Sequence, residues 1–207
     1  MFDGFNNLSV GQLRAAYQII GGEEAFMQLL RGELTITKPE RAWREEDGVI
    51  YFSLTSNGMN GPQWIEHLQK KGDRVTDDAK QLLHSQDFKP TNGVVYQIAA
   101  LKGMLWKDED RTTKNIRAMA DKRKLEKPNA EVGCLIRDKF TDDELKAMGL
   151  WYMVAMHEPI KVSDGGPTLL RADRREKGRY LGAYCDRPDF QYYRELAFAF
   201  ELSQVGA

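Results

Sequence analysis

The segment that decides the fold is WYMVAMHEPI, residues 151–160. Apolar side chains occupy both faces of an extended chain over 151–156, which predicts a strand in the centre of a sheet. Three further extended segments are predicted at 168–174, 179–185 and 196–203, and turn-forming clusters separate them at 164–167, 177–178 and 187–189. Four strands joined by short loops predict an antiparallel β-meander in the C-terminal third of the chain.

Helix signals and a β-hairpin precede this meander. Extended segments at 41–44 and 49–55 flank a turn at 46–48, which predicts a hairpin. Helices are predicted after Pro62, after a Thr76 cap, and in three pieces between 108 and 149, with a strand over 93–105. Thr141 and Glu144 form a capping box in the last of these helices. Strands, then helices, then more strands predict an α+β fold of mixed helices and sheet rather than a doubly wound one.

The N-terminal region has a helical pattern of its own. Leu13, Tyr17 and Ile20 share one face of a predicted helix, and glycines at 21–22 and 32 bound a second helix. We therefore predict an N-terminal helical hairpin appendage over residues 1–38 and an α+β core domain over 39–207. Tyr17 occupies the place where a DNA-binding helix-turn-helix needs a small residue, and no basic helix follows. A docking appendage is the favoured interpretation.

Composition and charge exclude any long-range attraction to nucleic acid or membranes. The 207 residues carry 30 Lys and Arg against 31 Asp and Glu, and 42% of them are hydrophobic. With a net charge near zero, binding to a polyanion requires a local basic patch. Cys134 and Cys185 lie in separate apolar segments, as expected of reduced core cysteines. We find no secretory signal or membrane-spanning pattern, so we expect a soluble, cytoplasmic protein without a membrane partner.

Several longer segments are distinctive: WREEDGVIYFSLTSNG (43–58), DFKPTNGV (87–94), KPNAEVGCLIRDKFTDDELKAMGLW (127–151) and MHEPIKVSDG (156–165). Together they make residues 40–207 resemble a group of uncharacterised small proteins from uncultivated, small-genome bacteria. The resemblance implies no activity, cofactor or catalytic residue.

One candidate for acid–base chemistry is His157-Glu158-Pro159, at the end of the predicted central strand. An imidazole beside a carboxylate, with Lys161 close behind, is a combination that a small-molecule enzyme can use. However, neighbouring strand residues point to opposite faces. No second histidine stands at metal-binding spacing, so we predict no metal and no cofactor. The competing interpretation is a histidine bonded to backbone where proline ends the strand.

A weaker candidate is an anion site at Gly58 and Gly61, in the loop before the helix that Pro62 begins. Glycines at a helix N-terminus let a phosphate approach free N–H groups. Without a lysine or a second acidic residue, the pattern matches no nucleotide fingerprint. An ordinary strand-to-helix turn is favoured.

The most basic stretch lies between residues 169 and 194, where seven basic residues stand against four acidic ones and five aromatic residues are interleaved. Aromatic rings beside basic side chains hold single-stranded nucleic acid in many proteins. The same composition is also typical of the wet face of an exposed sheet. The predicted nucleic-acid or partner-binding residues are Arg171, Arg174, Arg175, Arg179, Tyr180, Tyr184, Arg187, Tyr192, Tyr193 and Arg194.

The leading hypothesis is a non-catalytic binding or regulatory module that engages nucleic acid or a protein partner through this C-terminal sheet. One alternative is a small-molecule enzyme with His157 as its acid–base residue, supported by Glu158 or Lys161. The other is a structural protein that associates with itself through the sheet. The sequence leaves the three open, because strand register is not fixed by pattern alone.

Overall fold

The computed structural model describes residues 9–34, 41–163, 165–175 and 178–203, without the side chains of residues 12, 13 and 16. Contacts divide the chain into two compact units, 1–41 and 42–207, and each is described by itself. The first unit contains two helices, α1 (Val10–Ile19) and α2 (Gly22–Leu30), within the region where a helical hairpin is predicted. Residues 1–8 and 35–38 of the predicted appendage lie outside the described residues.

The second unit is built on one mixed sheet. Its path through the described residues is β1-β2-β4-β10-β6-β8-β9-β3, while β5 pairs with β10 and β7 with β8. Neighbouring strands are antiparallel except β10 with β6 and β3 with β9, which are parallel. The strands are β1 (Arg44–Glu46), β2 (Val49–Asn57), β3 (Arg74–Val75), β4 (Asn92–Lys102), β5 (Leu125–Glu126), β6 (Tyr152–Ala155), β7 (Ile160–Lys161), β8 (Pro167–Arg175), β9 (Gly178–Cys185) and β10 (Leu196–Leu202).

The predicted antiparallel meander is wrong, although the α+β class is confirmed. The segments themselves form strands, but β10 does not lie beside β9. It enters the sheet between β4 and β6 and runs parallel to β6. Residues 196–200 are buried without interruption, so both faces of this strand need cover, and only a central position supplies it. A meander would have left β10 at an edge.

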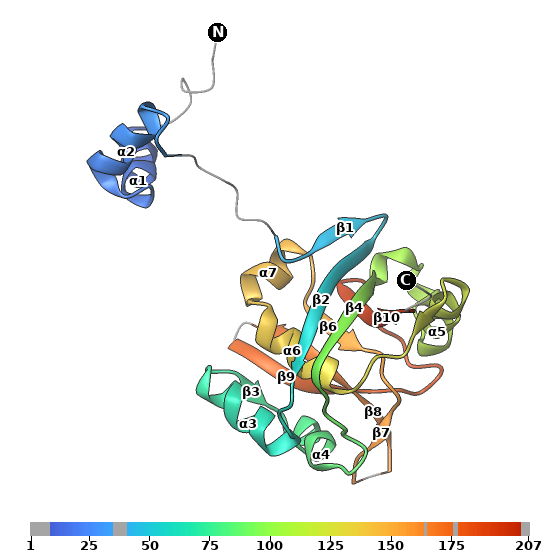
Figure 1. The fold of residues 1–207 in the computed structure, drawn as a ribbon. Coiled ribbons are helices and arrows are strands. Elements are labelled where there is room, and N and C mark those ends of the chain that lie inside the picture. Colours follow the sequence, from blue (N-terminus) through green and yellow to red (C-terminus); the bar gives the residue numbers. More distant parts are fainter. Residues whose placement is uncertain (1–8, 35–40, 164, 176–177, 204–207) are drawn as a thin grey trace. The chain divides into compact units, whose positions relative to one another are not determined.

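Helices cover the two faces of the sheet unequally (Figure 1). The larger apolar cluster lies under α3 (Gly61–Lys70), α4 (Asp77–His84), α6 (Glu131–Lys139) and α7 (Asp142–Ala147). The smaller cluster, on the opposite face, is covered by α5 (Thr113–Lys122) through Ile116 and Ala120. α5 contacts β5, and its Ile116 and Ala120 share the smaller cluster with side chains of β4, β6, β8 and β10.

Local helix signals are confirmed where the cap and the first turn decide the outcome. Thr76 accepts a hydrogen bond from the backbone N–H of Ala79, and Thr141 and Glu144 form the expected capping box. The helix expected from residue 108 instead begins at Thr113, after a 3₁₀ turn at Asp108–Asp110, because Thr112 provides the cap. No helix of the described residues is long and apolar enough to cross a membrane.

Candidate functional site

One face of the β8–β9 pair carries a row of arginines and tyrosines. Residues 171, 173 and 175 share this face because alternate residues of a strand point the same way. The register places Tyr180 opposite Asp173, with Tyr152 of β6 on the other side of that aspartate. Arg74 of β3 pairs with Tyr180 from the edge of the sheet. We call the set the arginine–tyrosine strip: Arg74, Tyr152, Arg171, Arg175, Tyr180 and Tyr184.

Each arginine of the strip lies against a tyrosine ring. The Cζ atom of Arg171 is 4.1 Å from the ring centroid of Tyr184 and 4.7 Å from that of Tyr152. Arg175 lies 4.8 Å from the ring of Tyr180. Arg74 lies 5.6 Å from the same ring and donates Nη1–H to its hydroxyl over 2.8 Å. Cation–π contacts of this kind hold the guanidinium planes in fixed orientations on the sheet.

A buried carboxylate lies beneath the arginines. Asp173 is fully buried, and its two oxygens face Arg171 Nε at 3.1 Å and Arg175 Nη2 at 2.7 Å. Burial raises the pKa of Asp173 above its ordinary value, against the opposing effect of Arg171 and Arg175. Gly182 makes this arrangement possible, because a Cβ there would lie 3.0 Å from both Arg171 Nε and Asp173 Oδ2. Three arginines against one aspartate leave the strip positive.

Several N–H groups of these arginines have no partner among the described residues and can bind an anion. The terminal nitrogens of Arg171 donate to no described residue, and neither does Nη1 of Arg175. The side chain of Arg175 is 38% exposed and that of Arg171 is 12% exposed. Arg74 is exposed at the edge of the sheet. These donors therefore point from a rigid sheet toward solvent, where an anionic oxygen can reach them.

Two of the predicted binding arginines lie on the other face. Arg174 stacks on the ring of Trp151 at 4.2 Å and donates to the carbonyl of Leu150. Arg179 forms an ion pair with the buried Asp73 at 2.8 Å and donates to the carbonyl of Arg137. Strand alternation separates both from the strip, so the ten predicted residues do not form one surface.

The remaining predicted aromatic residues differ in exposure. Tyr192 is 3% exposed, and its ring contacts those of Tyr184, Phe190 and Phe198, so it supports the strip from within the core. Tyr193, by contrast, is 68% exposed. Together with Arg194 it lines a separate open cavity of about 500 Å³.

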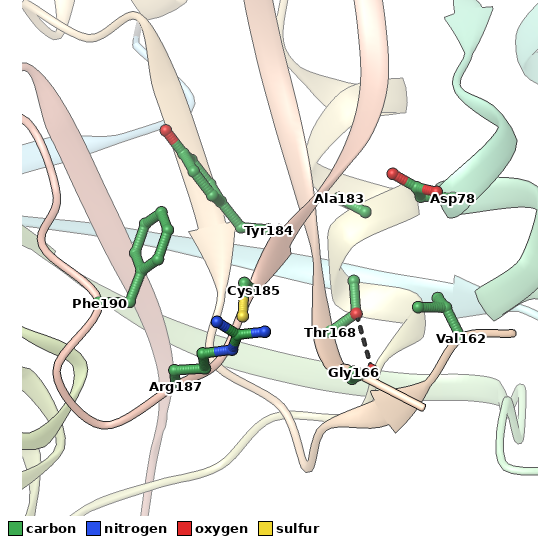
Figure 2. Close-up of a pocket in the computed structure, with 9 residues that line it drawn as sticks. All are labelled: Asp78, Val162, Gly166, Thr168, Ala183, Tyr184, Cys185, Arg187 and Phe190. Carbon is green, nitrogen blue, oxygen red and sulfur yellow. Dashed lines mark hydrogen bonds between the residues drawn. The ribbon is translucent and has the colours of Figure 1, made fainter. Parts of the chain in front are cut away.

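A smaller cavity of about 310 Å³ adjoins the strip at Tyr184 (Figure 2). Tyr184 belongs to both the cavity and the strip, and Figure 2 shows Phe190 and Arg187 on the same side of the cavity as Tyr184. Asp78 and Val162 lie on the opposite side. The guanidinium of Arg187 bonds to no described residue. With Phe190 and Arg187 in its lining, the cavity continues the row of aromatic rings and cations beyond the end of β9.

His157 lies in the core. It is 1% exposed, its Nε2 accepts the backbone N–H of Leu170 at 3.0 Å, and its Nδ1 lies 2.6 Å from the carbonyl of Glu158. Burial lowers the pKa of His157 to about 4. Glu158 and Lys161 are exposed, and Glu158 pairs with Lys127. Both ring nitrogens of His157 are therefore engaged by backbone groups, and the residue lies between β6 and β7, where the predicted strand is divided.

The predicted anion site at Gly58 and Gly61 is occupied by the protein's own contacts. Asn60 caps α3 by accepting from the backbone N–H of Gln63, and Gln63 bonds back to Asn60. Gly61 is buried, and a Cβ at this position would lie 1.7 Å from the carbonyl oxygen of Leu83. The glycine therefore lets α3 approach α4, which is a packing role.

Sequence reasoning missed Arg74 and Tyr152, which come from strands that are distant along the chain. The two residues Arg74 and Val75, which precede the Thr76 cap, are too short a segment to predict a strand. In the part of the chain that the structure describes, no group of three or more His, Cys, Asp or Glu side chains could hold a metal ion. No protein-family model matches the chain, and no curated protein or solved structure is significantly similar to it.

Proposed function

We propose that this protein is a non-catalytic binding module that holds single-stranded nucleic acid on the arginine–tyrosine strip. The observation that carries the proposal is the stacking of Arg171 and Arg175 on tyrosines of the same sheet face. Single-stranded nucleic acid is bound by aromatic rings and guanidinium planes that stack on bases, beside cations that contact phosphates. The strip combines these two elements on rigid strands.

The size and charge of the strip suit this ligand. From Tyr184, which lies opposite Leu169, to Arg175 the strip covers six residue steps of β8, about 20 Å, which is room for several nucleotides. Single strands expose their bases, so a flat sheet can stack against them without entering a groove. The local excess of arginine supplies a basic patch on a chain whose net charge is near zero. A duplex hides its bases and should bind less tightly.

The test is a fluorescence anisotropy titration with labelled single-stranded DNA and RNA of about 20 nucleotides, and with duplexes of the same sequence. With three phosphate contacts we expect log K to fall with log salt at a slope of about −2, so affinity should drop about fifteenfold between about 50 and 200 mM salt. No binding to any single strand at the lower salt would overturn the proposal and direct the search to an acidic protein partner.

Neighbouring residues of β8 provide a matched pair of variants. Arg175→Ala removes a cation from the strip, whereas Arg174→Ala removes one from the opposite face. We expect Arg175→Ala to weaken binding several-fold and to reduce the salt slope by about 0.7, while Arg174→Ala binds like the unaltered protein. Equal effects of the two substitutions would show that net charge, not the strip, governs binding.

A further inference from the structure

The outer edge of β9 is only partly covered by β3. β3 pairs with two residues of β9, of which Leu181 is the last, and then Thr76 caps α4 and turns the chain out of the sheet. The backbone N–H of Thr76 still donates to the carbonyl of Leu181. Among the described strands, none follows along residues 182–185 on this side. Because backbone groups of alternate strand residues point the same way, the N–H and C=O of Ala183 and the N–H of Cys185 point to this open edge.

The cavity of about 310 Å³ lies at the open edge of β9. Its lining includes the consecutive residues Ala183, Tyr184 and Cys185. Neighbouring side chains of a strand point to opposite faces, so three in a row line one cavity where that cavity borders the edge of the strand. Asp78, in the first turn of α4, lines it from the point where β3 has ended. The cavity therefore occupies the place that a longer β3 would fill.

The two sides of this cavity carry opposite charges. Figure 2 shows Asp78 on one side and Arg187 on the other. Neither side chain has a hydrogen bond or an ion pair with a described residue. Between them Val162 and Ala183 provide an apolar surface, and both pack against the larger apolar cluster. A ligand that matches this arrangement has a cationic group, an apolar part and an anionic group.

We propose that the cavity binds a short extended peptide, which continues the line of β3 along the edge of β9. Addition of a strand to an exposed sheet edge is a recurrent mode of peptide recognition. Since β3 runs parallel to β9, a peptide in its line runs from Asp78 toward Arg187. Its N-terminal ammonium then faces Asp78, and its C-terminal carboxylate faces Arg187. Residues 183–185 span about 10 Å, which is the length of about three peptide residues.

The test is a calorimetric titration of the full chain with trialanine and with its N-acetylated and C-amidated forms. For trialanine we expect a dissociation constant of about 0.1–1 mM, the range for a ligand of this size. Each blocked form should bind at least about fivefold more weakly, because it has lost one charged group. No binding of trialanine or of alanyl-valyl-alanine at about 10 mM, where even a millimolar complex forms, would overturn the proposal.

Cys185 provides a second measurement, because its free thiol lines the cavity while the other free cysteine, Cys134, is buried. A thiol reagent should therefore modify Cys185 first, and bound trialanine should slow that modification. The proposal does not depend on nucleic-acid binding by the arginine–tyrosine strip. Protection of Cys185 by single-stranded DNA but not by trialanine would show that the cavity belongs to a nucleic-acid site, and would overturn the proposal.

Two variants identify the contacts with the peptide termini. Asp78→Asn should make trialanine and its N-acetylated form bind alike, and Arg187→Ala should do the same for trialanine and its C-amidated form. Asp77→Asn is the matched control, because it removes the neighbouring carboxylate of α4, which bonds to Lys80 and does not line the cavity. It should leave both differences unchanged. Differences that persist in Asp78→Asn and Arg187→Ala would overturn the proposal.

Discussion

The backbone N–H of Leu170 donates a hydrogen bond to Nε2 of His157 over 3.0 Å. The imidazole thereby takes the place of the backbone carbonyl that a neighbouring strand would otherwise offer to this N–H. It does so in the gap between the end of β6 and the start of β7. Because Nε2 is the acceptor, the ring proton lies on Nδ1 and is donated to the carbonyl of Glu158. The histidine is neutral in the folded state and closes a gap in the sheet.

This arrangement predicts how stability depends on pH. The pKa of His157 is about 4 in the folded protein against 6.5 for the free side chain, so the unfolded state takes up the proton first as the pH falls. The stabilisation from this group is complete above pH 6.5 and is lost between pH 6.5 and 4, by about 3 kcal/mol.

The measurement is urea unfolding of the unaltered protein and of His157→Gln at several pH values. The comparison cancels buried carboxylates such as Asp173, whose raised pKa acts in the opposite direction. We expect the stability difference between the two proteins to shrink by about 3 kcal/mol from pH 7 to pH 4. A difference that stays constant with pH would show that His157 is not held neutral.

Because the guanidinium of Arg137 is buried, we predict that substituting this residue causes a large loss of stability. It donates to the carbonyls of Asp173 and Phe140 and forms ion pairs with Asp73 at 3.5 Å and Asp142 at 3.1 Å. Arg137→Met leaves a buried carboxylate and two carbonyls short of partners, so we expect a loss of about 3–5 kcal/mol in the free energy of unfolding. The control is Arg44→Met, whose exposed ion pair with Glu46 should contribute less than about 1 kcal/mol. Similar losses in the two variants would contradict this reading.

The contact between α3 and α4 predicts that Gly61 tolerates no side chain. Gly61→Ala would place Cβ 1.7 Å from the carbonyl oxygen of Leu83, so the helices must separate. We expect a loss above about 3 kcal/mol, measured by thermal unfolding. Gly72→Ala is the control, because its Cβ would have nothing within 4 Å and it carries only the cost of a positive φ of 85°, about 1 kcal/mol. Equal losses would mean that backbone conformation, not packing, matters at Gly61.

The hydrogen bonds of Glu131, at the start of α6, predict that substituting this residue lowers the stability of the protein. Its buried carboxylate accepts from the backbone N–H of Thr91 at 3.1 Å and from the hydroxyls of Thr91 and Tyr96, each at 2.7 Å. Glu131→Gln replaces one accepting oxygen by a donor, which should cost about 2 kcal/mol. Glu144→Gln changes an exposed capping carboxylate and should cost well under half as much. Denaturant midpoints of the two variants decide the matter; indistinguishable midpoints would rule out a structural role for the Glu131 charge.

Features that adjacent residues determine could be predicted from the sequence, whereas features that depend on distant strands could not. The caps at Thr76 and Thr141 were predictable because a few adjacent residues determine them. The position of β10 was not, because it depends on which distant strands need a neighbour. Uninterrupted apolar character at 196–200 was the available signal for a central strand.

The candidate site could likewise be predicted only where adjacent residues determine it. Strand alternation in the segment from Arg171 to Arg175 indicates by itself that Arg174 faces the other way. Nothing near those residues indicates that Arg74 and Tyr152 complete the strip, because register between distant strands brings them there. The burial of His157 is likewise set by a bond to Leu170, thirteen residues away.

The central place of β10 has a consequence for how the protein is made. All the other described strands of the sheet precede residues 196–202 in the chain. A ribosome therefore makes the strands on both sides of β10 before it makes β10, which joins them. Until then, β4 and β6 each present an unpaired apolar edge of the kind that recruits foreign strands. The nascent chain is therefore most vulnerable to aggregation just before β10 emerges, and the two half-sheets cannot join until β10 has been synthesised.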